Sequence, residues 1–133
     1  MKLYQLVAPV LLALSSLANA APISDRIVVQ ANGDKAQFER SLKLASNMRE
    51  ILGKAKFEIV VFGPAVKFLT EESEEVSLIQ KILGEGIKII ACGRSLNTDN
   101  VKESDLASGI TVTPFGAVHI VNRQKQGWQY FKP

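Results

Sequence analysis

The chain has 133 residues, of which 47% are hydrophobic and 22% are charged, the composition of an ordinary globular protein. Its 16 basic and 13 acidic side chains give a formal net charge of +3 at pH 7. The basic residues are interspersed with acidic ones and form no stripe interleaved with aromatic residues, so nothing indicates a nucleic-acid-binding surface. No repeat, low-complexity segment or linker is visible in residues 21–133, which predicts a single domain there.

The first 20 residues have the pattern of a secretory signal peptide. Lys2 precedes an apolar run over residues 6–17, which ends in Ala18-Asn19-Ala20. That run is shorter than the roughly 20 residues that a membrane-spanning helix needs. We therefore expect cleavage after Ala20, a periplasmic or secreted domain of residues 21–133, and no membrane attachment after cleavage.

The first half of that domain predicts two strands joined by a helix. The β-branched run of residues 26–30 indicates a strand, and Asn32-Gly33-Asp34 supplies a turn and a helix N-cap. A helix is predicted from Lys35 to Gly53, because apolar residues recur there at helical spacing: Phe38, Leu42, Ala45, Met48 and Leu52. A second strand over residues 57–62 ends at Gly63-Pro64.

The second half repeats the alternation. Ser73 can cap a helix that ends at residues 84–86, and a third strand follows over residues 87–91. A helical turn near residues 105–106, a short strand over 110–112 and a helix over 116–123 precede an aromatic terminal segment, residues 127–131. Strands that alternate with helices predict a mostly parallel sheet with helices on both faces, a three-layer α/β fold.

Ligands of such sheets bind outside the carboxyl ends of the strands. Three predicted loops should meet there: Asn32-Gly33-Asp34, Phe62-Gly63-Pro64 and Cys92-Gly93-Arg94-Ser95. We therefore predict that Asn32, Gly63, Pro64, Gly93, Arg94 and Ser95 bind a ligand or support Cys92.

Cys92 is the only cysteine, so it cannot form an intramolecular disulfide. Three interpretations remain open: a packed small hydrophobic residue, a bridge to another chain, or a reactive thiol. Backbone N–H groups freed at Gly93-Arg94, the Arg94 guanidinium and a helix that could begin at Ser95 would all favour a thiolate. Gly93 would let a ligand approach the backbone closely.

The sequence does not support nucleotide binding, Ser-His-Asp hydrolysis or metal binding. The chain has neither of the glycine-rich phosphate-binding patterns, and no nucleophile elbow for Ser-His-Asp hydrolysis. His119 is the only histidine and has no nearby carboxylate partner in sequence, so no metal site is expected. His119 could approach Cys92 from the start of the last helix, but a solvated surface histidine is the favoured interpretation. No cofactor is expected.

Three blocks of sequence resemble the DsrE family: Glu58-Ile59-Val60-Val61-Phe62-Gly63-Pro64-Ala65-Val66, then Gly86-Ile87-Lys88-Ile89-Ile90-Ala91-Cys92, and the closing Gly127-Trp128-Gln129-Tyr130-Phe131-Lys132-Pro133. The chain is similar in particular to the small exported members. The resemblance implies a flavodoxin-like fold with a parallel sheet and assembly into trimers or hexamers. It also implies that the cysteine at the position of Cys92 carries sulfur as a persulfide.

Three functions therefore stay open at the level of sequence. The first is an exported protein that binds or carries sulfane sulfur on Cys92, more a carrier than a turnover enzyme, with a donor and an acceptor that the sequence does not identify. The second is a small-ligand-binding module with an incidental cysteine. The third is an oligomeric interaction protein, because Trp128, Tyr130 and Phe131 crowd a small domain and such residues favour interfaces.

Overall fold

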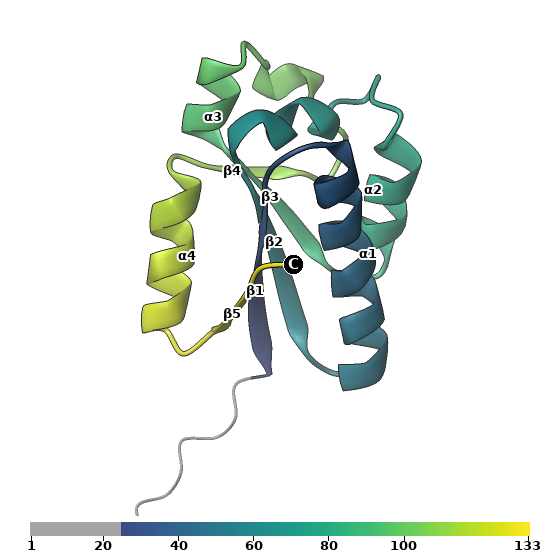
Figure 1. Ribbon diagram of the computed structural model, residues 1–133, viewed down its shortest axis with the longest axis vertical. Helices are drawn as coiled ribbons and strands as arrows, with labels where there is room; N and C mark the ends of the chain where they lie inside the picture. The colour runs from purple at the N-terminus through teal and green to yellow at the C-terminus, as the bar shows by residue number, and fades with distance from the viewer. Residues whose placement is uncertain (1–24) are drawn as a thin grey trace, which may run out of the picture.

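The computed structural model describes residues 25–133 and shows a five-stranded sheet between two layers of helices (Figure 1). All strand pairs are parallel, and the strand order is β4-β3-β2-β1-β5. The strands are β1 (Arg26–Ala31), β2 (Lys56–Val61), β3 (Lys88–Cys92), β4 (Thr111–Thr113) and β5 (Gln129–Phe131). The predicted signal peptide, residues 1–20, lies outside the described residues.

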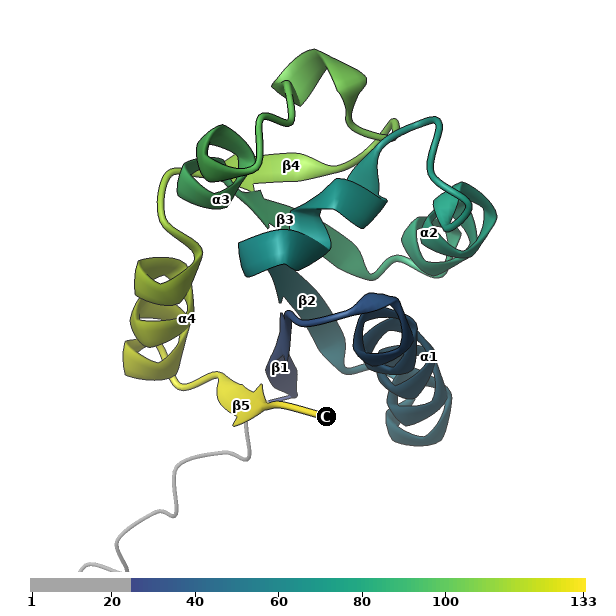
Figure 2. The ribbon, with the colours of Figure 1, turned by 45° about the horizontal axis from the view of Figure 1, so that its top comes forward.

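The helices divide between the two faces of the sheet. They are α1 (Lys35–Leu52), α2 (Val76–Gly84), α3 (Gly93–Thr98) and α4 (Gly116–Lys125), with 3-10 helices η1 (Gly63–Leu69) and η2 (Glu103–Asp105). Helices α1 and α2 cover one face and α4 covers the other, whereas η1 and α3 lie above the carboxyl end of the sheet (Figures 1 and 2). The predicted three-layer, flavodoxin-like α/β fold is confirmed. No helix within residues 25–133 has the length and hydrophobicity to cross a bilayer.

The predicted helix over residues 35–53 begins with the expected cap. The Asp34 carboxylate accepts a hydrogen bond from the Gln37 N–H at 2.9 Å, and the Gln37 side chain accepts one from the Asp34 N–H at 3.0 Å. This capping box satisfies two N–H groups that the first turn leaves without partners. Phe38, Leu42 and Ala45 are buried, but Leu52 is 51% exposed, so the apolar stripe leaves the core in the last turn.

Several predicted boundaries differ from the observed ones by one or two residues, and two of the differences concern α2 and the segment around Cys92. Ser73 is not the N-cap of α2. That position is Glu75, and the Ser73 hydroxyl instead accepts a hydrogen bond from the Glu75 N–H, just before α2 begins at Val76. The third strand includes Cys92, and α3 begins at once at Gly93 rather than at Ser95. Two elements were not predicted: η1 after Gly63, and β5 in the aromatic segment, which pairs with β1.

The two faces of the sheet differ in character. The face under α1 and α2 holds a large core of aliphatic and aromatic side chains. The face under α4 holds only a small cluster of Val28, Val60 and Ile120, with Phe62 and Trp128 packed against it, and the buried carboxylate of Glu58. Because side chains alternate along a strand, Glu58, Val60 and Phe62 all point toward α4.

Candidate functional site

Cys92 is the last residue of β3 and forms part of the wall of a cleft at the carboxyl end of the sheet. The residue is only 4% exposed, and the cleft has a volume of about 480 Å³. Three segments form it: the start of η1, the helix α3 and the start of α4. The lining residues are Phe62, Gly63, Pro64, Cys92, Arg94, Ser95, Thr98, Asp99, Phe115 and Ala117.

Hydrogen-bond donors surround the Cys92 sulfur. The Gly116 N–H donates to Sγ with a nitrogen-to-sulfur distance of 3.2 Å. The Ser95 hydroxyl lowers the pKa of the neighbouring Cys92, and its oxygen accepts a hydrogen bond from the Gly63 N–H at 2.8 Å. The N–H groups of Arg94 and Ser95 complete the set. The structure thus brings Gly63, Arg94 and Ser95 together around Cys92, and their role in binding a ligand or supporting the thiol stays a prediction.

These donors shift the acidity of the thiol. Burial by itself raises the pKa of Cys92, but the Ser95 hydroxyl and the N–H groups of Gly116, Ser95 and Arg94 outweigh it, so the pKa is lowered from the ordinary 9.0. A lower pKa increases the fraction of thiolate, the nucleophilic form. The surroundings thus favour the thiolate form of a sulfur that is little exposed.

Arg94 acts on the sulfur in a different way from the one predicted. Its backbone N–H is among the groups that lower the pKa of Cys92. Its guanidinium lies over the Phe115 ring, with 5.3 Å between the guanidinium carbon and the ring centre. This cation–π contact joins α3 to the segment before α4, at the edge of the cleft.

The glycines of the site meet requirements of packing and backbone geometry. Gly63 has φ +64°, in the left-handed region that favours glycine, and Pro64 follows it in the first turn of η1. A side chain at Gly93 would meet the Thr113 carbonyl oxygen at 3.3 Å. Gly93 therefore accommodates the neighbouring strand β4, whereas the sequence suggested that it accommodates a ligand.

Asn32 does not lie at this cleft. It lines a separate pocket of about 140 Å³ at the ends of β1 and β5, together with Gln30, Gln37 and Lys132. Strand β2 lies between β1 and β3 in the sheet, so the first predicted loop is separated from Cys92. The prediction that all three loops converge holds only for the second and third.

Sequence reasoning missed the contribution of α4. Gly116, 24 residues after Cys92, supplies an N–H to the sulfur, and a Cβ at this position would meet the Cys92 Cβ at 3.1 Å and Val60 Cγ1 at 3.2 Å. A glycine at the start of the predicted last helix was visible in the sequence. Nothing local indicated that the helix approaches β3 so closely.

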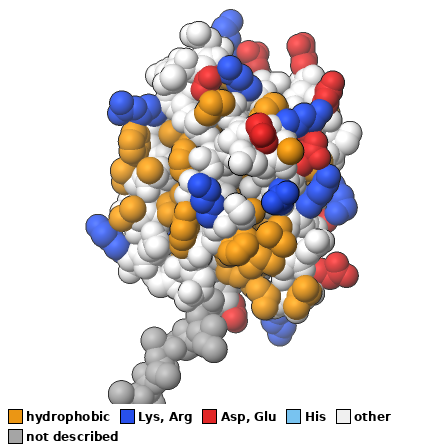
Figure 3. Space-filling model, viewed as in Figure 1, with side chains coloured by type: hydrophobic (Ala, Val, Ile, Leu, Met, Phe, Trp, Pro, Cys, Tyr) orange, Lys and Arg blue, Asp and Glu red, His pale blue; other side chains and the backbone are white. Residues whose placement is uncertain are grey.

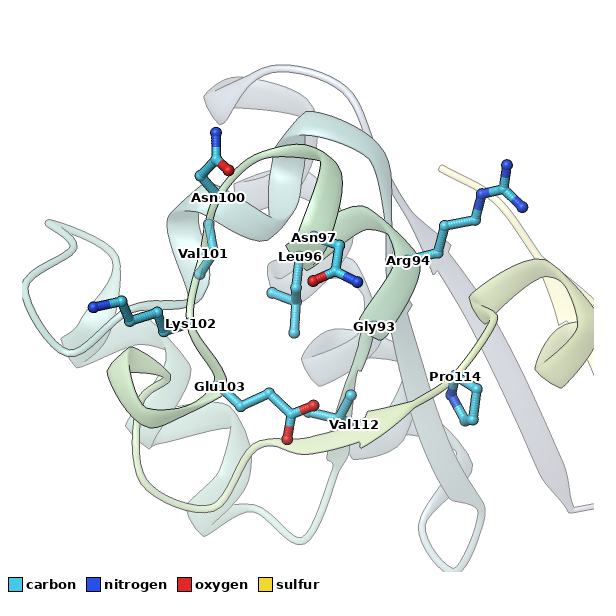
Figure 4. A pocket seen from close by; sticks show the side chains of 10 residues that line it. All are labelled: Gly93, Arg94, Leu96, Asn97, Asn100, Val101, Lys102, Glu103, Val112 and Pro114. Atoms are coloured by element: carbon cyan, nitrogen blue, oxygen red, sulfur yellow. The ribbon is translucent and has the colours of Figure 1, made fainter.

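A second and larger depression lies on the other side of α3. It has a volume of about 1000 Å³ and a floor that includes Leu96 and Val112 (Figure 4). Its rim is polar, and the Asn97 amide projects over it, whereas the Arg94 side chain points away from it (Figure 4). This basin lies next to β4 and does not include Cys92.

His119 does not line the Cys92 cleft, and it is not a solvated surface residue. Its Nε2 lies 2.8 Å from Glu58 Oε2, and its side chain is only 18% exposed. The sequence showed no carboxylate partner because Glu58 is 61 residues away in the chain. Within residues 25–133, no group of three or more His, Cys, Asp or Glu residues is arranged to hold a metal ion.

The match to the DsrE/DsrF-like family spans residues 27–133, essentially the whole described domain. The chain belongs to this family, which is associated with sulfur metabolism. A search of curated proteins found no match.

Three solved structures share the fold. A protein of unknown function, MTH1491 from Methanobacterium thermoautotrophicum, is 28% identical with a TM-score of 0.77; the alignment covers 81% of this chain and 98% of that one. The ychN protein from E. coli is 15% identical with a TM-score of 0.70, and the coverage is again 81% and 98%. The protein BT1422 from Bacteroides thetaiotaomicron, of unknown function, is 21% identical with a TM-score of 0.68, covering 82% and 95%.

Proposed function

We propose that this protein is an exported carrier of sulfane sulfur, which it holds as a persulfide on Cys92. The observation that carries the proposal is the environment of a single thiol at the edge of a cleft: the Gly116 N–H bonds to the sulfur at 3.2 Å, and the neighbouring Ser95 hydroxyl lowers the pKa of Cys92. Membership of a family associated with sulfur metabolism supports it.

The loading step needs no external oxidant or reductant. The Cys92 thiolate attacks the terminal sulfur of an inorganic polysulfide or a low-molecular-weight persulfide, and the S–S bond of the donor breaks. The donor leaves as a thiolate or a shorter polysulfide anion, and Cys92 becomes a persulfide anion. The donors that stabilise the thiolate lower the energy of the attacking form, and Phe62, Pro64 and Phe115 provide apolar walls around the bound sulfur chain.

The same arrangement suits a carrier more than a turnover enzyme. The lowered pKa of Cys92 makes the sulfur a good leaving group when an acceptor thiolate attacks the outer sulfur of the persulfide. Cys92 is the chain's only cysteine, so transfer must end on a thiol or other nucleophile of another molecule.

Intact-mass spectrometry tests the proposal directly. The purified protein is treated with inorganic polysulfide, desalted and weighed; we expect an added mass of about 32 Da per sulfur, reversible by a thiol reductant. The Cys92→Ser variant should remain unmodified. Failure of the folded parent protein to gain this mass, while the denatured chain does gain it, would refute the carrier function.

Export is part of the proposal and has its own test. The Ala18-Asn19-Ala20 site supports cleavage before Ala21 and delivery to the periplasm or the medium. N-terminal sequencing of the protein recovered from outside the cytoplasm should begin at Ala21. Recovery of chains that still begin at Met1 would contradict it.

A small-ligand-binding role remains a second candidate because of the basin beside α3, whose volume of about 1000 Å³ matches that of ordinary ligand pockets. Native mass spectrometry of the protein as isolated distinguishes the two functions. A co-purifying organic molecule that persists in the Cys92→Ser variant would favour ligand binding. A sulfur adduct that this variant lacks would favour the carrier.

We also propose self-association. Near the end of α1, Ile51 is 83% exposed and Leu52 51% exposed, and Tyr130 of the edge strand β5 is 43% exposed. Apolar side chains gather on this side of the molecule in Figure 3. Trp128 and Phe131, in contrast, are partly buried against the domain's own core, so of the three terminal aromatic residues Tyr130 is the one available to an interface.

A further inference from the structure

A buried ionic cluster joins α4 to the middle of the sheet. Glu58 of β2 is only 3% exposed. Its carboxylate accepts two hydrogen bonds from the Arg123 guanidinium, from Nε at 2.8 Å and from Nη2 at 2.9 Å, and His119 Nε2 lies 2.8 Å from the same carboxylate. A bidentate pair of this kind fixes orientation as well as distance.

Arg123 is held by further contacts on the same side of the sheet. Its Nη1 donates to the Gln126 side-chain oxygen at 2.8 Å, and its guanidinium carbon lies 4.9 Å from the centre of the Trp128 ring. Trp128 in turn packs against the small apolar cluster under α4. Arg123 therefore links β2, α4 and the segment that leads into β5.

The opposite end of α4 contacts the reactive thiol. Gly116 is the first residue of α4, and its N–H donates to Cys92 Sγ at 3.2 Å. His119 and Arg123 follow it at three and seven residues, spacings that place all three on one face of a helix. The apolar contact under α4 is small, so the ionic cluster is a major anchor of this helix.

We propose that Glu58, with His119 and Arg123, is a positioning cluster that holds α4 in place so that the Gly116 N–H stays bonded to the Cys92 sulfur. The inference rests on the proposed function of Cys92, but it concerns how the Gly116 N–H is positioned at the thiol and not the sulfur that the thiol carries. The Gly116 nitrogen already lies 3.2 Å from Cys92 Sγ, at hydrogen-bonding distance. Loosening of α4 can therefore only lengthen the bond.

Glu58→Gln tests the proposal, because the loss of geometry and the loss of charge should change the pKa of Cys92 in opposite directions. Glutamine keeps the shape of the side chain, but its amide group cannot accept both Arg123 hydrogen bonds. Loss of a carboxylate and the unbalanced Arg123 charge would by themselves lower the pKa of Cys92. The positioning role predicts the reverse: a rise of about half a unit to one unit, because one bond to the thiolate weakens.

Two measurements read out this effect. The pH dependence of thiol labelling gives the Cys92 pKa, and hydrogen exchange followed by NMR gives the protection of the Gly116 amide, which should fall in Glu58→Gln. The matched control is Glu39→Gln, which removes a carboxylate that pairs with Lys43 on the surface of α1, on the other face of the sheet. This control should leave the Cys92 pKa and the Gly116 protection unchanged.

A second variant covers the case in which Glu58→Gln does not fold. Arg123→Lys retains the positive charge but cannot form the bidentate pair with Glu58. It should raise the Cys92 pKa as Glu58→Gln does, but by a smaller amount. A folded Glu58→Gln or Arg123→Lys protein with an unchanged or lowered Cys92 pKa and full Gly116 protection would overturn the proposal. Failure of the parent protein to take up sulfur would refute the carrier function instead and leave these two measurements unaffected.

Discussion

Removal of the Ser95 hydroxyl is expected to raise the pKa of Cys92 by about one unit. The hydroxyl is the largest of the influences that lower this pKa. A hydrogen bond to a charged group is worth roughly 1.5–3 kcal/mol, and sulfur is a weak acceptor, so the lower end applies. At about 1.4 kcal/mol per unit, this corresponds to about one pKa unit.

The same substitution affects stability through a different group. The Gly63 N–H donates to the Ser95 oxygen at 2.8 Å in a partly buried position. Ser95→Ala leaves this N–H without its acceptor, which should lower the free energy of unfolding by about 1 kcal/mol. The two effects come from one oxygen atom and should appear together.

Alkylation rates measured across pH separate the two components of reactivity. At a pH below the Cys92 pKa of both proteins, the thiolate fraction of Ser95→Ala should be about tenfold lower. A thiolate of higher pKa is intrinsically more nucleophilic, so the net rate there should fall only about threefold to fourfold. Urea denaturation gives the stability. Ser46→Ala is the matched control, because the Ser46 hydroxyl on α1 bonds to Glu85, the residue that follows α2, and neither residue lines the Cys92 cleft.

An unchanged Cys92 pKa in Ser95→Ala would refute this account of the site. The lowered pKa would then have to come from the backbone N–H groups alone. Ser46→Ala should leave the labelling profile unaltered. A rise in the pKa of the control as large as that of Ser95→Ala would show that the shift reflects general loosening of the domain.

Three further predictions concern packing, acid stability and assembly. Gly116→Ala should lower the free energy of unfolding by about 1–3 kcal/mol in urea denaturation, because the added Cβ would crowd β3. Gly84→Ala should not destabilise the protein, because a Cβ there would meet no atom within 4 Å apart from its own helix backbone and chain neighbours. Burial raises the pKa of Glu58, but the bonds to Arg123 and His119 outweigh burial, so the pKa in the folded protein lies below the ordinary 4.5. The stabilisation that the Glu58 carboxylate provides is therefore present above pH 4.5 and is lost as the pH falls through the folded-state pKa. Glu58→Gln should then make the free energy of unfolding depend less on pH in the acid range. Light scattering at tens of micromolar should show an oligomer that Leu52→Lys weakens; a parent mass of one chain would exclude self-association.

Local patterns in the sequence were sufficient for most of the fold. The β-branched run of β1, the Asp34 cap and the apolar spacing of α1 depend on residues within a few positions of one another. Alternation of strands and helices then restricts the topology to a parallel sheet. The position of Cys92 at the carboxyl end of β3 follows from the same reasoning, as does its proximity to Gly63 and Ser95.

Only the tertiary structure decided which distant residues act on the thiol. Asn32 does not reach the Cys92 cleft, because it follows β1 and the strand order places β2 between β1 and β3. Gly116 and Cys92 are 24 residues apart, and Glu58 and Arg123 are 65 apart. Strand order and the path of α4 across the sheet bring these groups together, and periodicity within one segment carries no information about either. The physical reason is that local spacing determines which face a side chain occupies, whereas its partner is chosen by the packing of elements that are remote in the chain.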